Sequence, residues 1–178
     1  ARIDDPDGEG AAAFVRVFRE PALAAADASD TLRAQGVVPS PMAGIPFSIK
    51  DLCDVAGLTT NAGSVVMRNS APAKQDAPVV ARLRAAGAVI MGTTNMTEFA
   101  VGGLGLSLGT DTAGSVRIPA AMCGLAGFKP TVGRVPTEGI FPLSTTLDSV
   151  GPLAPSLACC ALVDAVFAGE DPNPRPQV

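Results

Sequence analysis

The 178-residue sequence contains no histidine, no tyrosine and no tryptophan. Without an imidazole, Ser-His-Asp and Cys-His catalysis is excluded, because both need histidine as the base. Two-histidine zinc sites and HExxH metallopeptidase motifs are excluded for the same reason. Acidic residues (17) outnumber basic residues (13), and aromatic residues make up 4%. Because nucleic-acid binding favours basic surfaces with stacking residues, this segment is not expected to bind nucleic acid.

The cysteines also lack the spacing of a metal site, since no CxxC pair occurs among Cys53, Cys123, Cys159 and Cys160. Neighbouring cysteines are poorly placed for a mutual disulfide, so we expect free thiols in a reducing cytoplasm, with Cys123 packed in the core. No metal and no cofactor are implied.

Membrane and export signals are missing as well. The most apolar stretch, residues 157–168, is interrupted by Asp164 and is far shorter than a membrane-spanning helix. The acidic residues 1–10 lack the basic start and apolar centre of a signal peptide. We therefore expect a soluble, cytoplasmic protein without a membrane partner.

Hydrophobic residues make up 47% of the chain, which is enough for a sizeable core, and residues 1–178 are expected to form a single domain. Local patterns predict alternating helices and strands, which is typical of an α/β layered fold. The predicted elements are a helix over 11–33 that Pro21 breaks or restarts, a turn-rich connection over 37–44, a strand over 45–50, a helix over 76–87 capped by Asp76, strands over 88–92, 106–109 and 127–129, a short helix over 119–123, and a last helix between Ser156 and Gly169.

Glycine is concentrated between residues 102 and 114, but neither GxGxxG nor a P-loop motif is present. The string GTDTAGSVRIP (109–119) instead combines small residues with a hydroxyl at Ser115. Tight turns of this kind can point successive backbone N–H groups into one concavity, which suits acyl transfer by a serine. The alternative interpretation is a polar turn in which Ser115 caps a helix.

A nucleophilic serine needs a base, and without histidine the candidate is a lysine. Lys74 lies in a polar stretch and should be solvated, whereas Lys129, before a proline, fits a structural role. Lys50 ends an apolar strand that would desolvate its ammonium and lower its pKa from about 10.4. An ion pair between Lys50 and Asp51 is the alternative, and local sequence leaves both open.

Two further polar residues have structural interpretations. Arg117 could clamp an anionic substrate, but a pair with an acid such as Asp111 is favoured. Asp148 is interpreted as a turn residue.

Four motifs occur in the order typical of one family: GIPFSIKDL, GTTNMTEFA, GTDTAGSVRIPAAMCGLAGFKPT and LDSVGPLA. The sequence resembles the amidase signature family, which implies a mixed β-sheet flanked by helices and a Ser–cis-Ser–Lys triad. By that resemblance Ser115 matches the nucleophile and Lys50 the base, while the amides of Thr112, Ala113 and Gly114 match the oxyanion hole. The family often has glycine at the position of Ala113, a change that a backbone donor tolerates.

The sequence departs from the family at the bridging cis-serine. Counting back from Ser115 by the family's spacing leads to the vicinity of Met91, where no Gly/Ser-rich segment is found. Ser107 is too close to the nucleophile to be assigned this role. We therefore expect that an internal segment is missing between Gly105 and Leu106, and that the chain is the N-terminal portion of a longer protein.

The resemblance implies an amidase that hydrolyses a carbon–nitrogen amide bond of a small molecule through a serine acyl-enzyme. Two alternatives stay open. One is the A-type transamidation subunit of a tRNA-dependent amidotransferase, and the other is a non-catalytic binding or scaffold domain on the same fold. The sequence names neither the substrate nor the oligomeric state, and a homo-oligomer is open.

Overall fold

The computed structural model describes residues 2–5, 7–8, 10–96 and 106–173. Six strands form one sheet in the order β1-β3-β2-β4-β6-β5. β2 runs parallel to both β3 and β4, whereas the other pairs are antiparallel, so the predicted mixed sheet is confirmed. The strands are β1 (Phe14–Val17), β2 (Pro46–Lys50), β3 (Val89–Thr94), β4 (Ser107–Asp111), β5 (Ala126–Gly127) and β6 (Ser149–Ala154).

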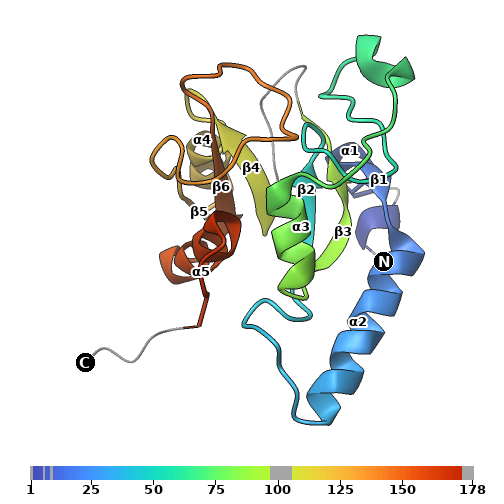
Figure 1. The fold of residues 1–178 in the computed structure, drawn as a ribbon. Coiled ribbons are helices and arrows are strands. Elements are labelled where there is room, and N and C mark those ends of the chain that lie inside the picture. Colours follow the sequence, from blue (N-terminus) through green and yellow to red (C-terminus); the bar gives the residue numbers. More distant parts are fainter. Residues whose placement is uncertain (1, 6, 9, 97–105, 174–178) are drawn as a thin grey trace.

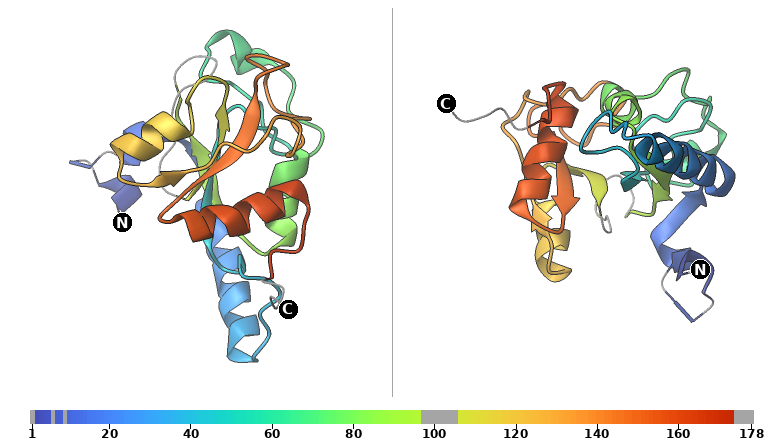
Figure 2. Two further views of the ribbon diagram at one scale, coloured as in Figure 1. Left: turned by 90° about the vertical axis from the view of Figure 1, so that its left-hand side faces the viewer. Right: turned by 90° about the horizontal axis from the view of Figure 1, so that it is seen from below.

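Helices cover both faces of this sheet (Figure 1). They are α1 (Gly10–Ala13), α2 (Arg19–Ala34), α3 (Pro78–Ala85), α4 (Arg117–Met122) and α5 (Leu157–Ala168), with short 3-10 turns η1 (Arg2–Asp4) and η2 (Val66–Asn69). α3 and α5 pack on one face, while α4 lies on the opposite face, as Figure 2 shows from below. Because side chains alternate along a strand, consecutive residues of one strand pack against the helices on opposite faces of the sheet.

The larger part of the core lies under α3 and α5. Phe47 and Ile49 of β2 and Leu108 of β4 are fully buried there. Phe47 meets Phe167 of α5 edge to face, with ring centroids 6.4 Å apart. On the other face, Val116, Ala120 and Leu153 form a smaller cluster beneath α4. This second cluster fixes the start of α4 against the sheet.

The N-terminal region corrects the prediction of a single helix over 11–33. Residues 14–17 form β1, which pairs antiparallel with β3. Phe14, Val15 and Val17 favour a strand, and the edge of β3 supplies their hydrogen-bond partners. The predicted restart near Pro21 is found, since α2 begins at Arg19 and Pro21 lies in its first turn, where its missing N–H costs nothing. Strand β6 was not predicted at all.

Several local predictions are confirmed. β2, α3 and β3 follow one another as a strand-helix-strand unit. Ser156 caps α5 by accepting the Cys159 N–H at 3.2 Å, and Gly169 ends that helix with φ near +80°. The predicted cap of α3 is wrong, however, because the helix follows Ala77, while Asp76 binds the Ala56 N–H and the Arg84 side chain.

All four cysteines are free thiols. Cys53 and Cys160 are buried, but Cys123 is exposed beyond the end of α4, so its predicted place in the core is wrong. Among the described residues, no helix is long and apolar enough to cross a bilayer.

Gly151 of β6 leaves no room for a side chain. A Cβ atom at this position would lie 2.1 Å from the Phe128 carbonyl oxygen. We expect Gly151→Ala to lower the free energy of unfolding by about 2 kcal/mol, because the backbone must shift. Gly133→Ala is the matched control, since a Cβ there meets no neighbour within 4 Å. Its φ of +83° alone should lower the free energy of unfolding by about 1 kcal/mol. Urea unfolding of both variants measures the difference, and equal losses would contradict the steric explanation.

Candidate active site

Lys50 ends β2 and is completely buried. Its Nζ donates a hydrogen bond of 3.0 Å to Oγ1 of Thr110, near the end of the parallel neighbour β4. The carboxyl ends of parallel strands are where α/β sheets place their ligands. The alternative ion pair with Asp51 is not formed in the described part of the chain, where Oδ2 of Asp51 also has no hydrogen-bond partner.

Burial lowers the pKa of Lys50 to about 8, although Cys53, Asp111 and Asp148 act in the opposite direction. Burial also raises the pKa of the Cys53 thiol, so this group is uncharged at neutral pH. Among the described residues, the negative charges that act on Lys50 are therefore the carboxylates of Asp111 and Asp148. With a pKa near 8, about a tenth of Lys50 is neutral at pH 7, which is the form that a general base requires.

Asp111 joins the end of β4 to the start of α4. Its buried carboxylate accepts hydrogen bonds from Nε and Nη2 of Arg117, both at 3.0 Å, which confirms the predicted pair. The same carboxylate accepts the backbone N–H groups of Val116 and Arg117 at 3.3 Å. Burial raises the pKa of Asp111, but these hydrogen bonds outweigh it and the pKa is lowered.

Ser115 is therefore not the helix cap. The N-cap position of α4 is Val116, which has no side-chain cap, and Asp111 serves the first N–H groups instead. Ser115 is 8% exposed, and its hydroxyl makes no hydrogen bond with another described residue. The N-cap alternative is thus wrong, and the hydroxyl is left without a structural partner in the described part of the chain.

The loop before Ser115 matches the need of an oxyanion site. Within the described ranges, the backbone N–H groups of residues 112–115 donate to no other residue. Gly114 has φ +141°, and a Cβ there would lie 2.6 Å from Cδ1 of Ile118. Ala113 does not have a positive φ, so alanine fits where the family often has glycine. Unpaired N–H groups in one loop beside a hydroxyl are what oxyanion stabilisation requires.

No hydrogen bond joins Lys50 to Ser115. The strand-loop connection brings them to the same end of the sheet, and within the described part of the chain the hydroxyl that accepts a hydrogen bond from Nζ is that of Thr110. The sequence analysis did not single out Thr110. Its position directly after the strand predicted over 106–109 was the signal that could have identified it. Within the described ranges, no group of Cys, Asp and Glu side chains could hold a metal ion.

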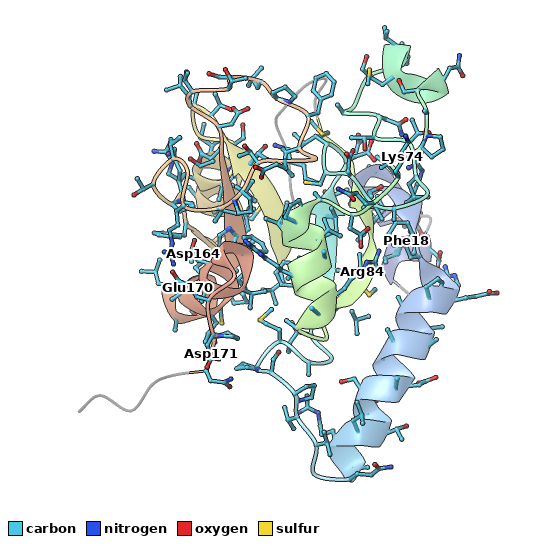
Figure 3. The ribbon with its side chains drawn as sticks, viewed as in Figure 1. Phe18, Lys74, Arg84, Asp164, Glu170 and Asp171 are labelled. Atoms are coloured by element: carbon cyan, nitrogen blue, oxygen red, sulfur yellow. The ribbon has the colours of Figure 1, made fainter. Side chains whose placement is uncertain are left out.

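The other serines and lysines near these strands have structural contacts. The hydroxyls of Ser48 and Ser107 lie in hydrogen-bond contact across β2 and β4. Lys129 donates to Oγ of Ser149 at 3.1 Å, and Lys74 is exposed on the loop before α3 (Figure 3). Lys50 is thus the lysine that the fold brings to the carboxyl ends of β2 and β4.

Asp148 is a second residue that sequence reasoning undervalued. Its carboxylate accepts the hydroxyl of Thr112 through Oδ1 and the N–H groups of Leu143 and Ser144 through Oδ2. It therefore connects the loop before β6 to the first residue of the loop that leads to Ser115.

Comparison with known proteins agrees with this arrangement. The family described as Amidase matches residues 8–105 and 100–178. AtzE, the 1-carboxybiuret hydrolase subunit of Pseudomonas sp. (strain ADP), is 42% identical over 86% of this chain and 41% of its own length. The A subunit of the glutamyl-tRNA(Gln) amidotransferase of Anaeromyxobacter dehalogenans is 40% identical over 97% of this chain and 42% of its own length. Native peptide amidase from Stenotrophomonas maltophilia superposes with a TM-score of 0.80 at 33% identity, covering 92% of this chain and 41% of that one.

These alignments also reveal an internal gap. The alignment with the amidotransferase subunit spans 208 positions, whereas the chain has 178 residues, so at least 30 residues of the relative (208 less 178) have no counterpart here. The family match falls into two parts that overlap at residues 100–105, which agrees with the expected gap after Gly105. Residues 97–105, which include part of the GTTNMTEFA motif, lie outside the described residues.

The chain spans about two-fifths of the length of the curated relatives that it matches. Within that span, the mixed sheet, the motifs around Lys50 and Ser115 and the family match over both halves agree. The chain therefore belongs to the amidase family.

Proposed function

We propose that this protein is an amidase in which Ser115 attacks an amide carbonyl and Lys50 is the base. The observation that carries the proposal is the fully buried Lys50, whose pKa of about 8 makes it usable near neutral pH. It lies at the end of β2, beside the strand that leads into the loop of unpaired N–H groups before Ser115. No structural interaction in the described residues accounts for the Ser115 hydroxyl.

The chemistry then follows the usual acyl-enzyme sequence. Neutral Lys50 takes the Ser115 proton through an intervening hydroxyl as Oγ bonds to the carbonyl carbon, and the N–H groups of residues 112–115 stabilise the oxyanion. The carbon–nitrogen bond breaks as the Lys50 ammonium protonates the leaving nitrogen. Water, deprotonated by neutral Lys50, then attacks the acyl-enzyme, releasing the acid and restoring the Ser115 hydroxyl.

The intervening hydroxyl is where this chain differs from its family. By the family resemblance, the bridging serine would lie in the segment for which the chain has no counterpart, and among the described residues the Thr110 hydroxyl accepts a hydrogen bond from Lys50. We propose that Thr110 relays the proton, and that the reaction is slower than in a protein with the full segment.

We propose a non-peptide, small-molecule amide as the substrate. Support comes from the greater identity to the 1-carboxybiuret hydrolase subunit (42%) than to the peptide amidase (33%). The free thiols fit a reducing cytoplasm. The proposed acyl-enzyme reaction needs no cofactor.

A second candidate is the transamidation subunit of a tRNA-dependent amidotransferase. It is favoured by 40% identity to such a protein over 97% of the chain. Co-purification with partner subunits and a dependence of activity on charged tRNA would distinguish it from a free-standing amidase.

A fluorophosphonate probe tests the nucleophile directly. We expect one adduct on the peptide that contains Ser115, with a rate that rises towards pH 8 as Lys50 loses its proton. Ser115→Ala should abolish labelling, whereas Ser156→Ala, which removes only the cap of α5, should leave it unchanged. Folded protein that shows no Ser115 adduct between pH 6 and pH 9 would instead be a non-catalytic domain.

A further inference from the structure

Asp148 makes more contacts than a turn residue needs. Oδ2 accepts the backbone N–H groups of Leu143 and Ser144 at 2.9 and 3.0 Å. The backbone N–H of Asp148 in turn donates to the Ser144 carbonyl oxygen at 3.0 Å. These three bonds close the loop of residues 143–148 and leave Oδ1 directed at Thr112, whose hydroxyl donates to it.

The strand register explains why this carboxylate reaches the loop before Ser115. Asp111 of β4 pairs with Ser149 of β6 in an antiparallel ladder. The residues just beyond these ends, Thr112 and Asp148, are therefore opposite each other. Because Thr112 is the first residue after β4, its contact fixes where the loop with the unpaired N–H groups leaves the sheet.

The partners of Asp148 also differ in charge from those of Asp111. Within the described ranges Asp148 has no ion pair, and all its partners are neutral donors. Among the described residues, the groups whose charge acts on Lys50 include Cys53, Asp111 and Asp148. The Cys53 thiol is protonated and Asp111 is paired with Arg117, so Asp148 is, of these three, the carboxylate without an arginine partner.

We propose that Asp148 is a positioning residue of the active site, which holds the oxyanion loop through Thr112 and keeps a negative charge beside Lys50. This inference rests on the proposed amidase function for its kinetic readout. The first role depends on the hydrogen bond from Thr112 to Oδ1, and the second depends on the negative charge of the carboxylate. They can therefore be separated by substitution.

Asp148→Asn removes the charge but keeps the contacts. The amide oxygen can accept the Leu143 and Ser144 N–H groups, while its NH₂ group donates to the Thr112 hydroxyl. We expect Lys50 to lose its proton more readily, so the pH midpoint of Ser115 labelling falls by about 0.5 or more. Glu138→Gln removes an exposed carboxylate that precedes Asp148 in the chain, and it serves as the charge control. We expect its pH midpoint of Ser115 labelling to be unchanged.

Thr112→Val does the reverse, because it removes the hydroxyl and leaves the charge in place. We expect labelling to slow by about tenfold or more at an unchanged pH midpoint. Thr112→Ser restores the donor and should restore the rate. A residue that merely stabilised the turn would produce neither the shifted midpoint nor the rescue by serine.

A second readout does not depend on reactivity. The protein has three lysines, Lys50, Lys74 and Lys129, so a ¹⁵N-lysine NMR titration can follow the Lys50 ammonium directly. We expect a lower Lys50 midpoint in Asp148→Asn than in the unsubstituted protein or in Glu138→Gln. If Ser115 is not labelled but the Lys50 midpoint still falls in Asp148→Asn, the proposed function is overturned. The electrostatic effect of Asp148 on Lys50 would then still be supported. An unchanged Lys50 midpoint with normal labelling of Thr112→Val would overturn the inference and leave the proposed function intact.

Discussion

Replacing Lys50 by methionine is expected to make the protein more stable at pH 7 and to reduce Ser115 labelling by about 10³-fold or more. The stability gain follows from burial. Lys50 is completely enclosed, and its pKa falls from 10.5 to about 8 because the charged form is poorly solvated. A shift of this size corresponds to about 3 kcal/mol, which the folded state loses while Lys50 is protonated. The loss of its hydrogen bond to Thr110 offsets part of the gain, so about 2 kcal/mol is expected.

The pH dependence gives this prediction a distinct signature. Below pH 8 both folded and unfolded chains carry a protonated Lys50, and the folded state bears the full cost of burial. Between pH 8 and 10.5 the unfolded chain holds more protons at this site, so the free energy of unfolding should rise with pH. Lys50→Met should lack this rise.

Urea unfolding at pH 7 and pH 9.5 measures the effect, with fluorophosphonate labelling in parallel. Lys74→Met is the matched control, since Lys74 is exposed and should affect neither stability nor labelling. If Lys50→Met were less stable than the unsubstituted protein at pH 7, the desolvation argument would be wrong. Full labelling of the variant would remove Lys50 from the mechanism.

The parts of this fold that sequence reasoning predicted have strong local signals. Pro78 near the start of α3 and Ser156 and Gly169 at the ends of α5 mark helices without help from the rest of the chain. Because the sequence has no histidine, a lysine was the candidate base. The apolar strand that ends at Lys50 distinguished it from the other lysines. Desolvation by that strand is a local effect, so it could be anticipated.

The missed features depend on pairing between distant segments. β1 follows an alanine-rich stretch and exists because the edge of β3, more than 70 residues away, supplies its partners. Asp148 acts on the loop before Ser115 only through the register of β4 with β6. Likewise, capping of α4 by Asp111 requires the tight turn at residues 112–115, which composition alone does not specify.

Asp111→Ala is expected to cost about 3 kcal/mol of unfolding free energy and to lower Ser115 labelling by at least about 100-fold. The substitution removes a buried carboxylate that accepts two hydrogen bonds from Arg117 and two from the backbone at the start of α4. The Val116 N–H would then be buried without a partner. Since Ser115 precedes this residue directly, its hydroxyl and the adjacent N–H groups should lose their fixed positions.

Asp76→Ala is a control matched in chemistry, because Asp76 also binds an arginine and a backbone N–H, but it is partly exposed and its partner Arg84 is exposed. It should cost less than about 1 kcal/mol and leave labelling unchanged. The pKa of Asp111 is lowered in the folded state, so its contribution is complete above the ordinary pKa of an aspartate and is lost as the pH falls below it. The stability difference between Asp111→Ala and the unsubstituted protein should therefore shrink in acid. A difference that stays constant from pH 7 down to pH 3 would mean that packing, and not the charged hydrogen-bond network, holds the start of α4 beside Ser115.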